Sequence, residues 1–242
     1  MTARNAGAAP IAAARGAGWL YLAIIVCGLV GELVVRTNLI VAGDAPATAA
    51  NVLASTGLFR LGFLADSIMF LCDVALAGLL YMLFRPVSKV LALVAMSLRL
   101  AQAAVLALNL LHYYGALLVL EGTGFASGFE PSQLQALSYL LLDLHGHGYD
   151  LGLLLFGLHC LLLGSLVWRS GFLPRILGAL VAAAGVVYLI GSYTRFLFPA
   201  YLQAITPIYA IALVAELGLC LWLLIKGVDA ERWNARVARA EP

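Results

Sequence analysis

The feature that most restricts the fold of this chain is a series of long apolar segments, each long enough to cross a lipid bilayer as a helix. A helix needs roughly 20 mostly apolar residues to span a hydrocarbon core of about 30 Å. Six such segments occur among the 242 residues, at 17–37, 58–84, 89–119, 134–168, 173–193 and 205–226. Only 11% of the residues are charged, whereas soluble domains carry about 25%. The sequence therefore predicts an all-α polytopic membrane protein, a bundle of six transmembrane helices.

The charges of the loops predict the orientation of this bundle. Basic residues collect in the termini and in the loops on one side, while the other side holds Arg195 with the acidic Asp44, Glu121 and Glu130. Cytoplasmic loops carry an excess of Lys and Arg, so we expect both termini in the cytoplasm and the chain in the cytoplasmic membrane. The expected parts are a cytoplasmic N-terminal segment, the transmembrane domain and a basic cytoplasmic tail, at 1–16, 17–227 and 228–242.

Net charge and cysteine spacing exclude several classes of function. The formal net charge is only +2, which gives no support to a nucleic-acid partner. The four cysteines lie inside apolar runs without a Cys-x-x-Cys spacing, so we expect neither a disulfide framework nor a zinc knuckle. The expected partner is membrane lipid, and a small-molecule ligand, other membrane subunits or further copies of the chain are open alternatives.

Ionisable residues inside the predicted spans point to a functional region, because such residues are costly in hydrocarbon and face protein or water. Four of them fall near the middle of the bilayer, namely Asp73, Arg99, His159 and Glu216. A larger polar group falls in the half of the bilayer away from the cytoplasm: Glu32, Arg36, Arg60, Asp66, Asn109, His112, Asp143, His145, His147, Asp150 and Arg195. We expect this group to line a hydrated pocket that opens outward.

Spacing and depth predict two ion pairs. Glu32 and Arg36 are four residues apart in the order that favours a pair on a helix. Asp73 and Arg99 lie at similar depth on consecutive spans, so each is the other's expected partner. Glu216 is a candidate third member of that pair.

The stretch DLHGHGYD in the fourth span raises the alternative of a metal site. Imidazole and carboxylate groups both bind zinc or iron, and the candidate ligands are Asp143, His145, His147 and Asp150. On a regular helix the two histidines point in nearly opposite directions, so this site requires the intervening glycines to break the helix.

A haem is a second cofactor alternative, because two histidines of the fourth span lie on one face. His145 and His159 are fourteen residues apart, a spacing reminiscent of b-type cytochrome helices, and a single haem between His112 and His145 is a variant of the same hypothesis. The simplest interpretation needs no cofactor and places the histidines in hydrogen bonds to water and loop carbonyls.

Four sequence blocks resemble a known family of membrane proteins. They are GWLYLAIIVCGLVGELVVR, LFRLGFLADSIMFLCDVALAGLLYMLFRPV, LDLHGHGYDLGLLLFGLHCLLLGSLVWRSGFLPRILG and AELGLCLWLLIKG. Over residues 15–227 the chain resembles the domain-of-unknown-function 4386 family, which implies six spans and a bacterial cytoplasmic (inner) membrane but no activity. The resemblance matches seven residues to positions in the family's motifs: Asp73, Arg99, His145, Gly148, Tyr149, His159 and Glu216.

Three hypotheses of function follow. The first is an outward-facing pocket that binds a small molecule or a lipid head group, with Arg60 and Arg99 as anion contacts and Asp143 and His145 near its mouth. Its expected ligand-binding residues are Asp66, Asp73, Arg99, Asn109, His112, Asp143, His145, Tyr149, His159 and Glu216. The second is an intramembrane metal-dependent enzyme that uses the fourth-span cluster. The third is an accessory or structural subunit of a membrane complex.

Overall fold

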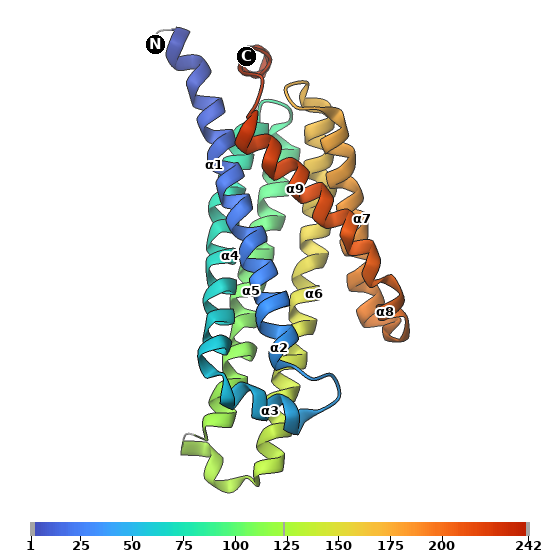
Figure 1. Cartoon of the computed structure of the whole chain (residues 1–242). Helices are drawn as coiled ribbons and strands as arrows, with labels where there is room; N and C mark the ends of the chain where they lie inside the picture. Colours follow the sequence, from blue (N-terminus) through green and yellow to red (C-terminus); the bar gives the residue numbers. More distant parts are fainter. Residues whose placement is uncertain (1–2, 123, 241–242) are drawn as a thin grey trace. The chain divides into compact units, whose positions relative to one another are not determined.

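Helices account for all the regular structure of the described chain. The computed structural model describes residues 3–122 and 124–240, and within these ranges there is no strand. Six helical segments are long and apolar enough to cross a membrane (Figure 1): Ala9–Leu39, Thr56–Phe84, Lys89–Glu121, Pro131–Ser170, Arg175–Leu197 and Pro199–Ile225. The prediction of an all-α protein with six membrane-spanning helices is confirmed, and residues 1–2 and 241–242 of its predicted end segments lie outside the described residues.

The first span combines three consecutive helical elements. They are α1 (Ala3–Leu29), the π-helical segment η1 (Val30–Arg36) and α2 (Thr37–Leu39). Helical structure thus begins well before the apolar run does. A π-helical segment inserts an extra residue per turn, and such segments are frequent at functional sites. Here the segment ends at Arg36.

A short helix, α3 (Ala45–Ala54), follows the first span. The carboxylate of Asp44 accepts a hydrogen bond from the backbone N–H of Ala47 at 2.9 Å, and a proline stands in the first turn. An aspartate cap followed by a proline is a strong local signal for the start of a helix, which explains why the chain turns helical at this point.

The remaining spans are long regular helices joined by short turns. The bounds are α4 (Thr56–Phe84), α5 (Lys89–Glu121), η2 (Gly124–Gly128), α6 (Pro131–Ser170), α7 (Arg175–Leu197), η3 (Pro199–Tyr201), α8 (Leu202–Ile205), η4 (Thr206–Ile208), α9 (Tyr209–Ile225) and α10 (Ala230–Ala240). Helix α6 continues unbroken through DLHGHGYD. Its glycines therefore do not interrupt the helix, contrary to what the metal hypothesis requires.

The chain forms two compact units. Unit 1 consists of residues 1–23, 72–103 and 150–242, and unit 2 consists of residues 24–71 and 104–149. Helices α1, α4, α5 and α6 each contribute one part to each unit.

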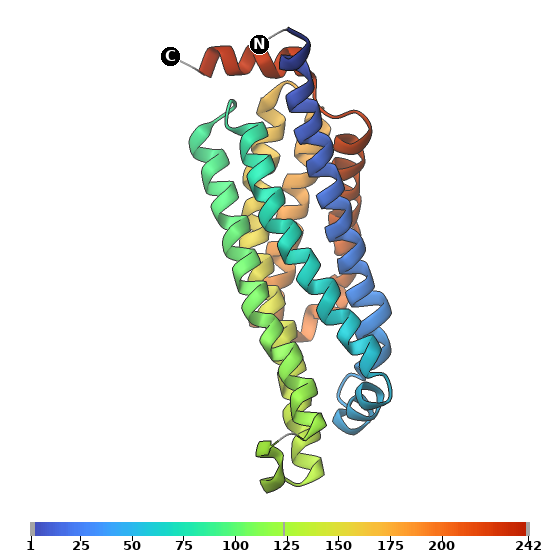
Figure 2. The same ribbon diagram turned by 90° about the vertical axis from the view of Figure 1, so that its left-hand side faces the viewer.

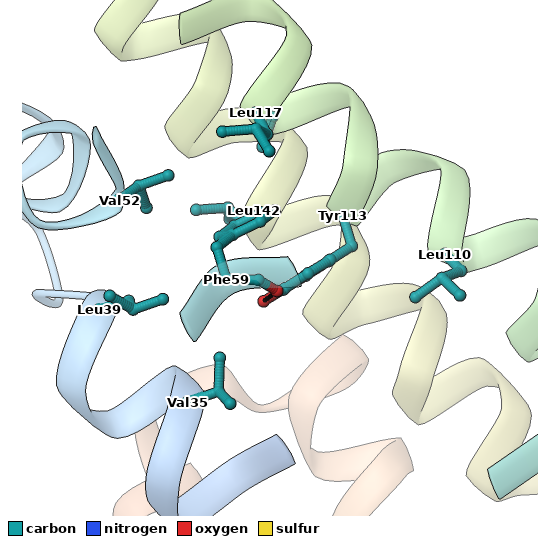
Figure 3. Packing of buried hydrophobic residues seen from close by; sticks show 9 residues of the cluster. Val35, Leu39, Val52, Phe59, Leu110, Tyr113, Leu117 and Leu142 are labelled. Atoms are coloured by element: carbon teal, nitrogen blue, oxygen red, sulfur yellow. Dashed lines mark hydrogen bonds between the residues drawn. The ribbon is translucent and has the colours of Figure 1, made fainter. Parts of the chain in front are cut away.

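Unit 2 has an apolar core built from its four long helical parts and α3. The rings of Phe59 and Tyr113 stack with centroids 4.0 Å apart, and the Tyr113 hydroxyl donates a hydrogen bond to the Phe59 carbonyl at 2.9 Å. A side chain at Gly62 would collide with the Tyr113 hydroxyl, so glycine permits this approach. Figure 3 shows the surrounding apolar side chains, which include Val35, Leu39, Val52, Leu110, Leu117 and Leu142.

Unit 1 contains a close helix contact between α6 and α7 made through glycines. A Cβ added at Gly164 would lie 2.6 Å from the Gly178 carbonyl oxygen, and one at Gly185 would lie 2.6 Å from the Gly157 carbonyl oxygen. Small residues at such contacts let backbones approach, which is how membrane helices gain packing energy without a hydrophobic driving force. Helix α9 packs on α7 through small side chains such as Ala184.

The C-terminal helix α10 crosses the ends of neighbouring helices in unit 1, as the side view of Figure 2 shows. Asp229 caps its start by accepting from the Arg232 backbone N–H at 3.1 Å. The Trp233 ring nitrogen donates to the Leu83 carbonyl at 2.9 Å. The Arg232 and Arg236 side chains donate to carbonyls at the end of α6 and in the turn that follows it. These bonds satisfy carbonyls that a helix end leaves without partners.

Candidate functional site

The first candidate centre lies in unit 2 and is called here the Arg36 centre: Arg36 of η1, Asp66 of α4 and His145 of α6. The Arg36 Nη2 contacts the Asp66 carboxylate and donates to His145 Nε2 at 3.1 Å. Its Nη1 lies 3.6 Å from a Glu32 oxygen. The Asp66 side chain is 6% exposed and that of Glu32 is 67% exposed, so the guanidinium connects a buried carboxylate with a surface carboxylate.

The contacts of His145 define its charge. Its Nδ1 lies 3.2 Å from the Asn109 carbonyl oxygen, while its Nε2 faces the guanidinium of Arg36. A carbonyl only accepts and a guanidinium only donates, so the ring carries its hydrogen on Nδ1 and is neutral. The Asn109 side chain donates in turn to the His145 carbonyl at 2.7 Å. A side chain at Gly148 would collide with Asn109, so this glycine allows α5 and α6 to meet.

Aromatic rings and an unsatisfied oxygen complete the Arg36 centre. The Arg36 guanidinium carbon lies 5.8 Å and 5.7 Å from the ring centroids of Tyr113 and Tyr149, distances at which cation–π attraction acts. Among the described residues, the buried Oδ1 of Asp66 has no hydrogen-bond partner. A Cβ at Gly31 would lie 3.2 Å from that oxygen and 2.9 Å from the Arg36 Nη1, so glycine at this position permits the close approach of η1 to the Arg36–Asp66 pair.

The second candidate centre lies in unit 1 and is called the Arg99 centre: Arg99 of α5, Asp73 of α4 and His159 of α6. The guanidinium of Arg99, which is 0% exposed, forms an ion pair with Asp73 and donates to His159 Nε2 at 3.1 Å. The Nδ1 of His159 lies 2.8 Å from the Ala95 carbonyl oxygen, so this ring is also neutral by its partners. The predicted Asp73–Arg99 pair is confirmed.

The two centres share one internal arrangement. In each, an aspartate of α4 pairs with an arginine, and a histidine of α6 accepts from that arginine while donating to a carbonyl of α5. Asp66 and Asp73 are seven residues apart, and His145 and His159 are fourteen apart. Both separations return to nearly the same face of a helix. The arginines do not follow this spacing, because Arg36 comes from η1 and Arg99 from α5.

Glu216 of α9 is held by a tyrosine and not by an ion pair. The Tyr188 hydroxyl of α7 donates to its Oε1. Within residues 3–122 and 124–240, no arginine, lysine or histidine forms a salt bridge with it. Glu216 thus forms no direct ion pair with Arg99, although the charge of Arg99 acts on it and Tyr21 lies beside both residues. Its direct hydrogen-bond partner is Tyr188, which the sequence did not indicate.

Several predicted site residues occupy other positions than expected. Arg60, expected to contact an anion, pairs with Glu121 at 3.0 Å, and its side chain is 60% exposed. His145, expected near the mouth of a pocket, is buried. His112 is exposed, with its Nδ1 3.2 Å from the Asn109 side-chain oxygen.

The four residues of the metal hypothesis do not converge. Both ring nitrogens of His145 face protein partners, Arg36 and the Asn109 carbonyl. His147 Nδ1 lies 3.5 Å from an Asp143 oxygen on an exposed part of α6, and Asp150 belongs to unit 1, where it pairs with Arg195 at 3.2 Å. In the part of the chain that the structure describes, no group of three or more His, Cys, Asp or Glu residues could hold a metal ion.

The haem hypothesis meets a similar obstacle. An axial histidine ligand must present a ring nitrogen to the iron. Both nitrogens of His145 and both of His159 face protein partners. In this conformation neither residue can ligate a haem.

Comparisons with known proteins agree with the sequence resemblance. A family model described as "Domain of unknown function (DUF4386)" matches residues 16–227. A relative from Archaeoglobus fulgidus, described as an uncharacterized protein, is 31% identical over 160 residues, which cover 66% of this chain and 80% of that relative. No solved structure matches the chain.

Proposed function

Because the chain belongs to the family described as "Domain of unknown function (DUF4386)", we propose its function from the Arg36 centre. This centre binds a small molecule or a lipid head group that carries a positively charged N–H donor. The observation that supports the proposal is the Oδ1 of Asp66, a buried acceptor without a hydrogen-bond partner in the described chain. A buried acceptor left unsatisfied costs about 1–3 kcal/mol, which a donor group of a ligand would recover.

The charge balance of the centre favours a cation. Arg36 contributes one positive charge, Asp66 and Glu32 contribute one negative charge each, and His145 is neutral by its partners. One negative charge is left without a counterion. A charged side chain at membrane depth costs roughly 2.5–3.5 kcal/mol on insertion scales, and a bound ammonium group would offset this cost.

Access and shape also suit an ammonium group. Glu32 is exposed beside the guanidinium of Arg36, so a ligand can approach from that side. Gly31 places no side chain against the Asp66 Oδ1. Because the rings of Tyr113 and Tyr149 already contact the Arg36 guanidinium, the carboxylate, and not a ring face, is the proposed contact of the ammonium.

Native mass spectrometry of the purified protein tests this proposal with two lipids that differ in their head group. Phosphatidylethanolamine carries an ammonium with N–H donors, whereas phosphatidylcholine carries none. We expect the wild type to retain the first in preference to the second, and Asp66→Asn and Gly31→Ala to lose that preference. Glu121→Gln, in the exposed pair of the same unit, is the matched control and should keep it. Equal retention of both lipids by the wild type, with no small cationic adduct that Asp66→Asn removes, would contradict the proposal.

We also propose a location in the bacterial cytoplasmic membrane with both termini in the cytoplasm. The support is the concentration of Arg and Lys in the loops of one side. Labelling of single cysteines at Lys89 and Glu130 with a membrane-impermeant maleimide in intact cells tests it. The cysteine at position 130 should react and that at position 89 should not.

The Arg99 centre supports a second candidate function, that of a structural or accessory subunit. Arg99 has no exposed surface, and its guanidinium contacts Asp73 and His159. These contacts would fix the register of the helices that carry them, with membrane subunits or further copies of the chain as the proposed partners. Failure of assembly in an Asp73/Arg99 double variant that keeps its head-group preference would favour this role.

A further inference from the structure

A cavity of about 430 Å³ lies in unit 1, between the turn that joins α4 to α5 and the C-terminal part of α10. Its lining includes Tyr81 and Arg85 near the end of α4, Ser88 and Lys89 at the start of α5, and Val237 of α10. Among the residues that the structure describes, the lining has two basic side chains and no acidic one. Its chemistry therefore favours an anion.

The basic residues around α10 divide into two groups by their contacts. Arg232 and Arg236 donate to the carbonyls of Gly171 and Arg169 and so serve to dock the helix. The side chains of Arg85 and Lys89 form no ion pair or hydrogen bond with any residue in 3–122 or 124–240. Their two positive charges remain available to a bound group.

The start of α5 adds polar groups to the same wall of the cavity. Ser88 caps the helix, because its Oγ accepts from the Leu91 backbone N–H at 3.4 Å. The amino end of a helix carries a partial positive charge and backbone N–H donors, which together favour phosphate. The Tyr81 side chain lines the cavity as well.

The apolar surroundings of the cavity indicate where the rest of the ligand would lie. Val87 and Val237 contribute apolar walls. On the adjoining helices, Met82 is 47% exposed and Val90 is 70% exposed, as expected of residues that face lipid chains. We propose that this cavity binds the phosphate group of an anionic lipid, with Arg85 and Lys89 as its charged contacts. The site is separate from the Arg36 centre and would take a head group of the opposite charge.

Titration of the purified protein with dioleoylphosphatidylglycerol and with dioleoylphosphatidylcholine, followed by native mass spectrometry, tests the inference. A basic residue near an anionic lipid surface contributes about 1 kcal/mol. We therefore expect phosphatidylglycerol affinity to fall about fivefold for Arg85→Gln or Lys89→Gln and about thirtyfold for both. Val237→Trp should fill the cavity and lower the affinity without a change in charge.

Matched controls separate this site from general surface charge and from the Arg36 centre. Arg175→Gln with Lys226→Gln removes the same charge from exposed positions of unit 1 outside the cavity lining and should leave phosphatidylglycerol binding within about twofold of the wild type. Asp66→Asn should also leave it unchanged. Equal losses in the control and cavity variants, or no preference for phosphatidylglycerol in the wild type, would overturn the inference. Displacement by millimolar inorganic phosphate as effective as displacement by lipid would assign the cavity to soluble phosphate and overturn the lipid assignment.

Discussion

Removing one member of the Asp73–Arg99 pair should destabilise the protein far more than its single hydrogen bonds suggest. The Arg99 side chain is 0% exposed and the Asp73 side chain is 3% exposed. Asp73→Asn therefore leaves a guanidinium without a counterion in a site that water does not reach. Breaking a buried ion pair in this way costs about 3–5 kcal/mol, and we expect the free energy of unfolding to fall by that amount.

The double variant Asp73→Asn/Arg99→Met should lose much less free energy of unfolding than the two single variants lose together. Arg99→Met alone leaves the buried Asp73 charge without a counterion and also removes the donor to His159. Its loss of unfolding free energy should therefore match or exceed that of Asp73→Asn. The double variant removes both charges and leaves mainly the His159 acceptor without a donor, which costs about 1–3 kcal/mol. The summed losses of the two single variants should therefore exceed the loss of the double variant by several kcal/mol.

Unfolding in mixed detergent micelles with rising dodecyl sulfate, followed by tryptophan fluorescence, gives the four free energies of this cycle. Additivity of the two single losses within about 0.5 kcal/mol, the range expected of independent sites, would contradict a buried ion pair. Single losses below about 1 kcal/mol would refute it equally, because they would place the pair in contact with water.

Three further predictions concern packing and docking. Gly148→Ala should lower the unfolding free energy by about 1–3 kcal/mol through its collision with the asparagine of α5, whereas Gly78→Ala, with open space around it, should be neutral or stabilising in the same micelle assay. His145→Leu should destabilise the protein because it strands the buried partners of the ring, and His147→Leu at its exposed position should change stability by less than about 0.5 kcal/mol. Trp233→Phe removes the hydrogen bond that ties α10 to the end of α4, so amide exchange in 230–240 should accelerate while exchange in α4 stays unchanged; equal rates in the two proteins would show that the bond does not hold the helix.

The spans could be predicted from the sequence because hydrophobic length is a local property. The predicted third span, 89–119, nearly coincides with α5, and the predicted second span, 58–84, with α4. The predicted first span starts too late, because residues 3–16 are alanine-rich and carry Arg4 and Arg15, which lowers their hydropathy, yet they continue the helix. Hydropathy identifies the part of a helix that hydrocarbon can solvate, and not the whole helix.

The partners of buried charges could be predicted only where depth alone selected them. Asp73 and Arg99 were matched because both lie near the middle of consecutive spans. The spacing predicts Glu32 as the partner of Arg36, but in the π-helical turn of η1 Arg36 also pairs with Asp66, and glycine at position 31 permits this close contact. A π-helical turn shifts the face of every later residue, and hydrophobic periodicity does not reveal it.

The metal hypothesis for α6 depended on a local break that the sequence favoured and the packing removed. Gly146 and Gly148 could interrupt an isolated helix, since glycine is a poor helix former. In the folded chain, the contact of Gly148 with Asn109 needs a glycine inside a regular helix. A glycine in a membrane span can thus mark a close helix contact instead of a break.

A density map of the protein in nanodiscs of native lipid, inspected beside Asp66, distinguishes a ligand-binding centre from a structural contact. We predict an ordered head group or small cation within hydrogen-bond distance of the Asp66 Oδ1. Acyl chains or protein side chains packed directly against that oxygen, with Arg36, Asp66 and His145 contacting only one another, would contradict the account and leave the Arg36 centre a structural contact.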